Sequence, residues 1–233
     1  MNTNLDRIRK DLRALADPAR AVVMQRFFKT GQGQYSEGDV FIGVPVPQSR
    51  KVAKSHQSCD LGTVGELLHS EIHEERLVGL LVLVHKYDSG DKGIVEFYLE
   101  NLEQVNNWDL VDLTAPGILG AHLFNKSRSL LYRQARSKIL WEKRIAIVAT
   151  YYFIRKNDYG DTLKIAEILL KDEHDLIHKA VGWMLREVGK RDLKALETFL
   201  GHHHAKMPRT MLRYAIERLP EKKRKFYMLA ERR

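Results

Sequence analysis

The sequence is poor in cysteine and in long apolar runs. Cys59 is the only cysteine among 233 residues, so no disulfide can form within the chain, and we expect a reducing compartment. The longest apolar run, from Leu77 to Val84, is far shorter than the roughly 20 residues that cross a bilayer. Residues 1–20 are charged and carry no apolar signal-peptide core. These absences predict a cytoplasmic protein without a membrane partner.

Alternating segments of Val, Ile and Thr, which would indicate strands, are also absent. Apolar residues recur instead at helical spacing, beginning with Leu5, Ile8 and Leu12. The stretch from Gly31 to Pro47 has four glycines and two prolines, so we expect a loop there and a helix that starts near Gln48. From about residue 62 the pattern predicts helices of about 12–18 residues separated by short breaks. The predicted breaks fall at 87–90, at 106–107, at 157–161, near 189 and at 201–208.

A repeat becomes visible when the starts of the helices are aligned. The segments HEERLVGLLVLVHKY, WEKRIAIVATYYFIRK and LIHKAVGWMLREVGKR share a polar start, a basic residue and a tightly apolar continuation. Equivalent positions in this register are Arg76, Asp112, Arg144, Lys179 and Thr210, with gaps of 36, 32, 35 and 31 residues. Small residues stand three positions further on, at Gly79, Ala115 and Gly182. A period in the mid-thirties predicts an all-α fold, an α-solenoid of antiparallel helical pairs (HEAT-like repeats).

We expect a single HEAT-like domain over residues 1–233. About 1–60 would hold N-terminal helices and the glycine-rich loop, about 61–220 the core repeats, and 221–233 a basic tail. Equivalent positions of stacked repeats lie on one face, so the register predicts a concave basic surface. That surface would be lined by Arg76, Asp112, Arg144 and Lys179.

Acidic residues are outnumbered, with 30 Asp and Glu against 39 Lys and Arg, which gives a net charge of +9. Such a surplus favours an anionic partner, nucleic acid first and an anionic membrane surface second. A curved wall that carries several cations suits the backbone of double-stranded DNA.

Asp112 is the one carboxylate in the row of basic positions. An ion pair with Arg144 or Arg76 is its structural explanation, and a role in chemistry is its functional one. Asp109 has a complete structural explanation, because the helix dipole favours an acid in the first turn of a helix. Asn106 or Asn107 can cap that helix.

Two tryptophans each lie one helical turn from the row of basic positions. Trp108 precedes Asp112 by four residues, and Trp183 follows Lys179 by four. A tryptophan in a helix is more often a core residue than a ligand-binding one. Aromatic faces also attract cations and stack on bases, so both tryptophans are candidate binding residues.

Several of these segments resemble a known family. NNWDLVDLTAPGILG, WEKRIAIV and LIHKAVGWMLREVGK are similar to signature segments of the bacterial DNA alkylation repair (AlkD-type) glycosylases, and GVPVPQSR resembles the N-terminal segment of that family. The resemblance runs from about residue 20 to about 220. It implies an all-helical HEAT-like fold and the excision of positively charged N3- and N7-alkylated purines. It places the catalytic acid on Asp112, its aromatic partner on Trp108, the active-site arginine on Arg144 and the second tryptophan on Trp183.

The resemblance and the basic row together give the predicted DNA-binding residues, which are Phe27, Arg50, Arg76 and Lys179. Three features depart from the family pattern. Many relatives have a second tryptophan where this chain has Asn107, and an N-terminal tyrosine that approaches the lesion is Phe27 here. The insertion-like stretch 31–39 is longer and richer in glycine than the pattern.

The residue types suit this chemistry independently of the resemblance. An alkylated purine with a positive charge is already a good leaving group, so little protonation of the base is needed. A single ionised carboxylate can stabilise the developing charge on the sugar and position water. Asp112 would act in its deprotonated form, which a nearby Arg144 would favour.

Other readings of the sequence lead to different tests. A non-catalytic helical-repeat scaffold that binds structured nucleic acid or an acidic protein would bind duplexes with steep salt dependence and release no base. An RNA-binding repeat would need a regular code of residues in each repeat, which the chain lacks. His202, His203 and His204 have no supporting ligands at metal-binding spacing. We expect no metal, no cofactor, no obligatory protein partner and a monomer.

Overall fold

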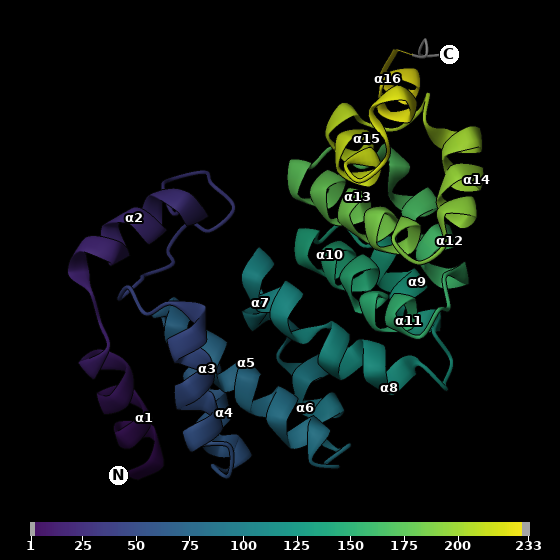
Figure 1. Cartoon of the computed structure of the whole chain (residues 1–233). Coiled ribbons are helices and arrows are strands. Elements are labelled where there is room, and N and C mark those ends of the chain that lie inside the picture. The colour runs from purple at the N-terminus through teal and green to yellow at the C-terminus, as the bar shows by residue number, and fades with distance from the viewer. Residues whose placement is uncertain (1–2, 230–233) are drawn as a thin grey trace. The chain divides into compact units, whose positions relative to one another are not determined.

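A computed structural model describes residues 3–229, and its secondary structure is helical throughout apart from one isolated bridge between Val40 and Ile72 (Figure 1). The all-α prediction is therefore confirmed. The chain divides into two compact units, Met1–Thr114 (unit 1) and Ala115–Arg233 (unit 2). Within the described residues, no helix combines the length and the apolar composition that crossing a membrane requires.

The helices of unit 1 surround one buried helix, α5. Its residues from Leu77 to Leu83 are buried, and it packs against α3, α4 and α7. The apolar run of the sequence is therefore the central helix of this unit. The helices of unit 1 are α1 (Thr3–Ala14), α2 (Pro18–Phe28), α3 (Val46–Ser55), α4 (Leu61–Leu68), α5 (His73–Asp88), α6 (Ile94–Glu100) and α7 (Trp108–Thr114).

The predicted loop after α2 is held by a buried carboxylate. Glu74, which is 0% exposed, accepts hydrogen bonds from the backbone N–H groups of Ile42, Gly43 and Val44, at 3.1, 2.8 and 3.1 Å. Gly43 has a φ of +85°, and a Cβ there would lie 2.1 Å from the carbonyl oxygen of Asp17. Only glycine fits this close approach, so the loop is pinned between the start of α2 and the start of α5.

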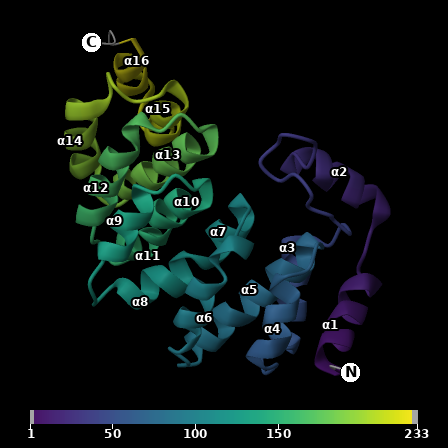
Figure 2. The same cartoon turned by 180° about the vertical axis from the view of Figure 1, so that it is seen from behind.

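Unit 2 is built from two layers of helices. The helices α10, α13 and α15 lie side by side, and α9, α12 and α14 form the second layer (Figures 1 and 2). A π-helical turn at Pro116–Gly120 begins the unit. Its helices are α8 (Ala121–Leu123), α9 (Ser129–Ala135), α10 (Leu140–Ala149), α11 (Tyr151–Arg155), α12 (Gly160–Ile168), α13 (Asp175–Gly189), α14 (Leu193–His203), α15 (Arg209–Ile216) and α16 (Glu221–Leu229).

The predicted breaks near 88, 107, 158 and 189 are confirmed, whereas α14 continues through His203, beyond the break predicted from 201. The predicted helix lengths are wrong in several places, since α6 and α7 have only seven residues each. Short helices persist here because packing on neighbours, rather than length, supplies most of their stability. The predicted basic tail is partly helical as α16, and its residues 230–233 lie outside the described part of the chain.

The aligned positions fall near the starts of their helices. Arg144 and Lys179 are each the fifth residue of their helix, α10 and α13. Gly182, three residues after Lys179, faces α15 so closely that a Cβ would lie 2.5 Å from the carbonyl oxygen of Met211. The small residue of the repeat thus lies where two stacked helices approach closely.

This approach predicts that Gly182→Ala destabilises the protein by about 1–3 kcal/mol, because backbone atoms of α15 must move to admit the methyl group. The matched control is Gly201→Ala in α14, where a Cβ meets nothing within 4 Å. That control is expected to be neutral or to stabilise by up to about 1 kcal/mol. Urea denaturation of both variants measures the difference, and equal free energies of unfolding would contradict the prediction.

Candidate active site

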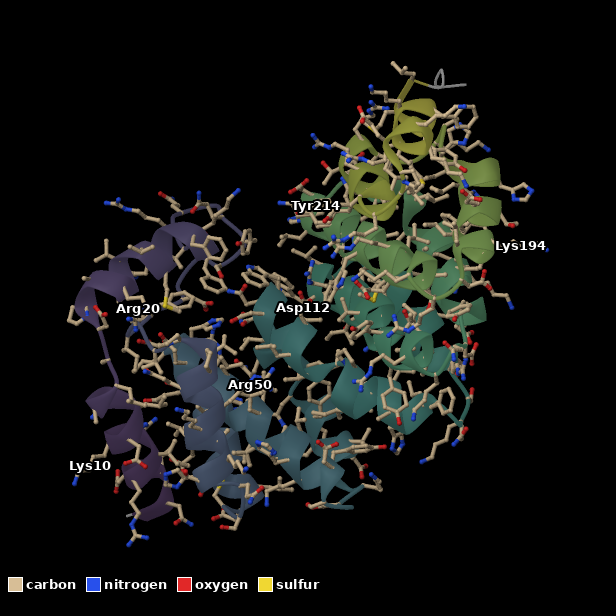
Figure 3. The ribbon with its side chains drawn as sticks, viewed as in Figure 1. Lys10, Arg20, Arg50, Asp112, Lys194 and Tyr214 are labelled. Carbon is tan, nitrogen blue, oxygen red and sulfur yellow. The ribbon has the colours of Figure 1, made fainter. Side chains whose placement is uncertain are left out.

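Helix α7 carries an acid and an aromatic ring one turn apart on the same side. Trp108 and Asp112, four residues apart on this helix, are both half-buried. Figure 3 labels Asp112 on the ribbon of α7. The ring of Trp108 stacks on that of Phe28, with centroids 5.0 Å apart, and meets the edge of Phe27 at 5.9 Å. Phe27 is 64% exposed. Unit 1 therefore brings together three predicted site residues, Phe27, Trp108 and Asp112.

The stack continues into the interior of unit 1. Phe41 stacks on Phe28 with centroids 4.7 Å apart, and the imidazole of His73 stacks on Phe41 at 4.4 Å. His73 is 1% exposed. A column of rings thus leads from the half-buried Trp108 to a buried histidine, which the sequence analysis did not identify.

His73 lies between two buried carboxylates. Its Nε2 is 2.9 Å from Oδ2 of Asp109, and its Nδ1 is 3.1 Å from Oδ2 of Asp39. Burial by itself would lower the pKa of His73, but the charge and hydrogen bond of Asp109, with the hydrogen bond of Asp39, raise it to about 9. The ring is therefore a cation at neutral pH, with both nitrogens donating.

Arg76 completes this buried group of charges. Its Nη2 lies 2.5 Å from Oδ1 of Asp39, and its Nη1 donates to the carbonyl oxygen of Ser70 at 2.9 Å. Burial would raise the pKa of Asp39, but the hydrogen bond from His73 and the charges of Arg76 and His73 hold it below its usual value. Arg76 is 4% exposed, and its guanidinium is paired with Asp39 in the interior of unit 1.

Asp109 lies in the first turn of α7, as predicted, and has a further structural role. Its side chain is buried and bound to His73. Asn107 precedes the helix as expected, and its Oδ1 accepts from the N–H of Trp108 at 2.8 Å. Its Nδ2 donates to Oδ2 of Asp39 at 3.1 Å and to the hydroxyl of Ser36. Asn107 therefore joins the same buried group.

Arg50 lies on α3 with an exposed side chain (Figure 3). It remains a predicted DNA contact of unit 1. Of the four residues predicted to bind DNA, Phe27 and Arg50 are exposed in unit 1, while Arg76 is buried there and Lys179 belongs to unit 2.

Unit 2 carries the other predicted site residues. Arg144 is 4% exposed, and its Nη1 donates to the carbonyl oxygen of Leu176 at 2.6 Å, which ties α10 to α13. Lys179 pairs with Asp175 at 2.6 Å on the same helix. Trp183, one turn after Lys179, is half-buried, and its ring centroid lies 5.8 Å from that of Tyr151.

Among residues 3–229, no group of three or more His, Cys, Asp or Glu is placed to hold a metal ion. His202 and His203 belong to the last turn of α14, where Nδ1 of His202 is 2.9 Å from the carbonyl oxygen of Thr198.

Comparisons with known proteins agree with this fold. A family described as DNA alkylation repair enzyme matches residues 8–219. A solved structure described as a predicted DNA alkylation repair enzyme from Enterococcus faecalis aligns with a TM-score of 0.72 at 17% identity, over 88% of this chain and 97% of that one. AlkD2 from Streptococcus mutans aligns with a TM-score of 0.58 at 15% identity, over 85% and 96%. At these identities the likeness shows the fold, and a search of curated proteins finds no significant match.

The charged state of His73 predicts a pH dependence of stability. Because its pKa is raised from 6.5 to about 9, its contribution is complete below pH 6.5 and is lost as the pH rises through about 9. The loss amounts to up to about 3 kcal/mol in the free energy of unfolding.

Denaturation of the wild type and of His73→Gln between pH 6 and pH 9.5 measures this contribution. The difference between the two proteins is expected to shrink as the pH rises. The control is His69→Gln, a matched change at an exposed residue at the end of α4. A constant difference across this range would contradict the prediction.

Proposed function

Because the chain belongs to the DNA alkylation repair enzyme family, we propose that it is a DNA glycosylase acting on duplex DNA. Its substrates are positively charged N3- and N7-alkylated purines, and it hydrolyses the bond between the base and the sugar. The observation that carries this proposal is the arrangement on α7, where the carboxylate of Asp112 follows Trp108 by one helical turn and the ring of Trp108 contacts the exposed Phe27.

The proposed reaction begins with departure of the base. The electron pair of the glycosidic bond moves to the purine and neutralises its positive charge, which leaves an oxocarbenium-like sugar. Asp112, as a carboxylate, stabilises that developing charge and positions water on the anomeric carbon. The water adds there and loses a proton, so that the products are a free base and an abasic site.

The aromatic residues and the cations have separate roles in this proposal. The rings of Trp108 and Phe27 offer π-faces to the cationic nucleotide. Trp183 and Arg144 of unit 2 are assigned contacts with the sugar and phosphate around the lesion, as the family motif implies. The hydrogen bond to the carbonyl oxygen of Leu176 fixes the orientation of the Arg144 guanidinium, which suits a contact with one phosphate or sugar.

Asp112→Asn tests the chemistry directly. We expect the release of 7-methylguanine and 3-methyladenine from methylated duplex DNA to slow by at least about 10²-fold, because the variant lacks the charge that stabilises the sugar cation. Duplex binding should persist, since the change removes a negative charge from a DNA-binding protein. Single-turnover assays with chromatographic detection of the free base measure the rate.

The control is Asp88→Asn, an exposed acid at the end of α5, which should leave the rate unchanged. The proposed function is wrong if the wild type releases neither base, or if Asp112→Asn releases them at the wild-type rate. Tight duplex binding without any base release would instead indicate the non-catalytic scaffold.

Arg50→Gln tests the proposed phosphate contact. The slope of log affinity against log salt concentration should become shallower by about 0.9 when one phosphate contact is lost. Lys10→Gln on α1 is the control, because Lys10 is also exposed but is not one of the residues predicted to bind DNA (Figure 3). Fluorescence anisotropy with labelled duplex DNA gives both slopes, and an unchanged slope for Arg50→Gln removes this residue from the interface.

A further inference from the structure

The residues on both sides of Trp108 are anchored in the interior. Asn107 is 0% exposed and Asp109 is 4% exposed, although the ring of Trp108 between them is half-buried. Asp109 is bound to His73, and Asn107 is bound to Ser36 and Asp39. Anchors directly before and after one residue fix the direction in which its side chain leaves the helix.

Asp112 shares that direction. It follows Trp108 by four residues on the same short helix, so its side chain projects from the same side one turn further on. Whatever sets the rotation of the first turn of α7 therefore also sets where the carboxylate points.

The anchoring residues form a balanced group of charges. Two carboxylates, Asp39 and Asp109, face two cations, His73 and Arg76. Removing one member leaves a buried charge without its partner, which is strongly unfavourable. The group therefore holds together three segments that are distant in the sequence, namely the loop 31–39, the start of α5 and the start of α7.

Two departures from the family pattern meet in this group. The insertion-like stretch 31–39 supplies Ser36 and Asp39. Their partner is Asn107, directly before α7, at the position where the family resemblance implies a tryptophan in many relatives. The hydrogen bonds of Asn107 to Ser36 and Asp39 therefore connect the stretch 31–39 with the residue before α7.

We propose that this buried group is a positioning device for the catalytic helix, with His73 as its central positioning residue and the loop 31–39 as the part that completes it. The proposal rests on the proposed function, since it assigns to the group the orientation of Trp108 and Asp112. His73 touches no substrate and acts through Asp109 and α7. Its loss is expected to slow bond cleavage and to leave binding of undamaged duplex unchanged.

Two variants test the device, His73→Gln and Asp109→Asn, and the second also serves if the first fails to fold. A misplaced catalytic group can reduce a rate by roughly 10²-fold, so we expect base release in single turnover to fall by that order. The dissociation constant for undamaged duplex should change less than about twofold. The control is Asp161→Asn in unit 2, which removes a partner of Arg128 and Tyr132.

A spectroscopic measurement tests the device without base release. The chain has three tryptophans, so Trp141→Phe with Trp183→Phe leaves Trp108 as the only reporter. In that background His73→Gln should shift the emission of Trp108 to longer wavelength and increase its quenching by acrylamide, because the ring loses its fixed place on Phe28. Asp161→Asn should change neither property.

The outcomes separate the two proposals. If the wild type releases no base, the proposed function fails. The emission of Trp108 then tests by itself whether the buried group positions α7. The device is overturned if His73→Gln and Asp109→Asn, both folded, release base at the wild-type rate or leave the emission unchanged. It is also overturned if rate and affinity fall together and Asp161→Asn behaves in the same way, since that is general destabilisation.

Discussion

Much of unit 1 depends on the contact of one buried imidazole with two carboxylates. His73 holds Asp109 of α7 through one ring nitrogen and Asp39 of the loop 31–39 through the other. Buried ions are expensive to strip of water, and such a group persists only when each charge has its partner. Arg76 supplies the second cation, so the loop, α5 and α7 stay together or separate together. The aromatic column from His73 to Trp108 extends this order towards the candidate site.

Unit 2 is held together by a different kind of contact. Its stacked helices approach at small residues, as at Gly182 against α15, and Arg144 links α10 to a carbonyl oxygen of α13. The same position of the repeat is therefore used in two ways. In unit 2 Arg144 joins neighbouring helices, whereas in unit 1 Arg76 is turned to a carboxylate from the loop 31–39. Equivalent positions of the repeat place residues near the start of their helices. The partners of each residue then decide its role.

The two acids of α7 show the same principle at the scale of one turn. Asp109 is buried and paired with an imidazolium, so its charge contributes to structure. Asp112 is half-buried, one turn from the ring of Trp108, where a cationic sugar can be stabilised by a carboxylate. A motif with two carboxylates three residues apart thus divides into an acid that positions and an acid proposed to react. This division fits the proposed reaction, in which the leaving group is already charged.

The sequence by itself determined the helical class, several of the breaks between helices, the start positions of the repeat and the spacing of Trp108 and Asp112 by one helical turn. These features depend on residues within a turn or two of each other, where helical periodicity and capping act. Only the tertiary structure decided the roles of His73, Asp39 and Asp109 and the burial of Arg76. His73 meets partners 34 and 36 positions away, and no local pattern shows which distant charges will share one low-dielectric interior. The tertiary structure also decided the lengths of the short helices, because packing against neighbouring helices stabilises them more than their own length does.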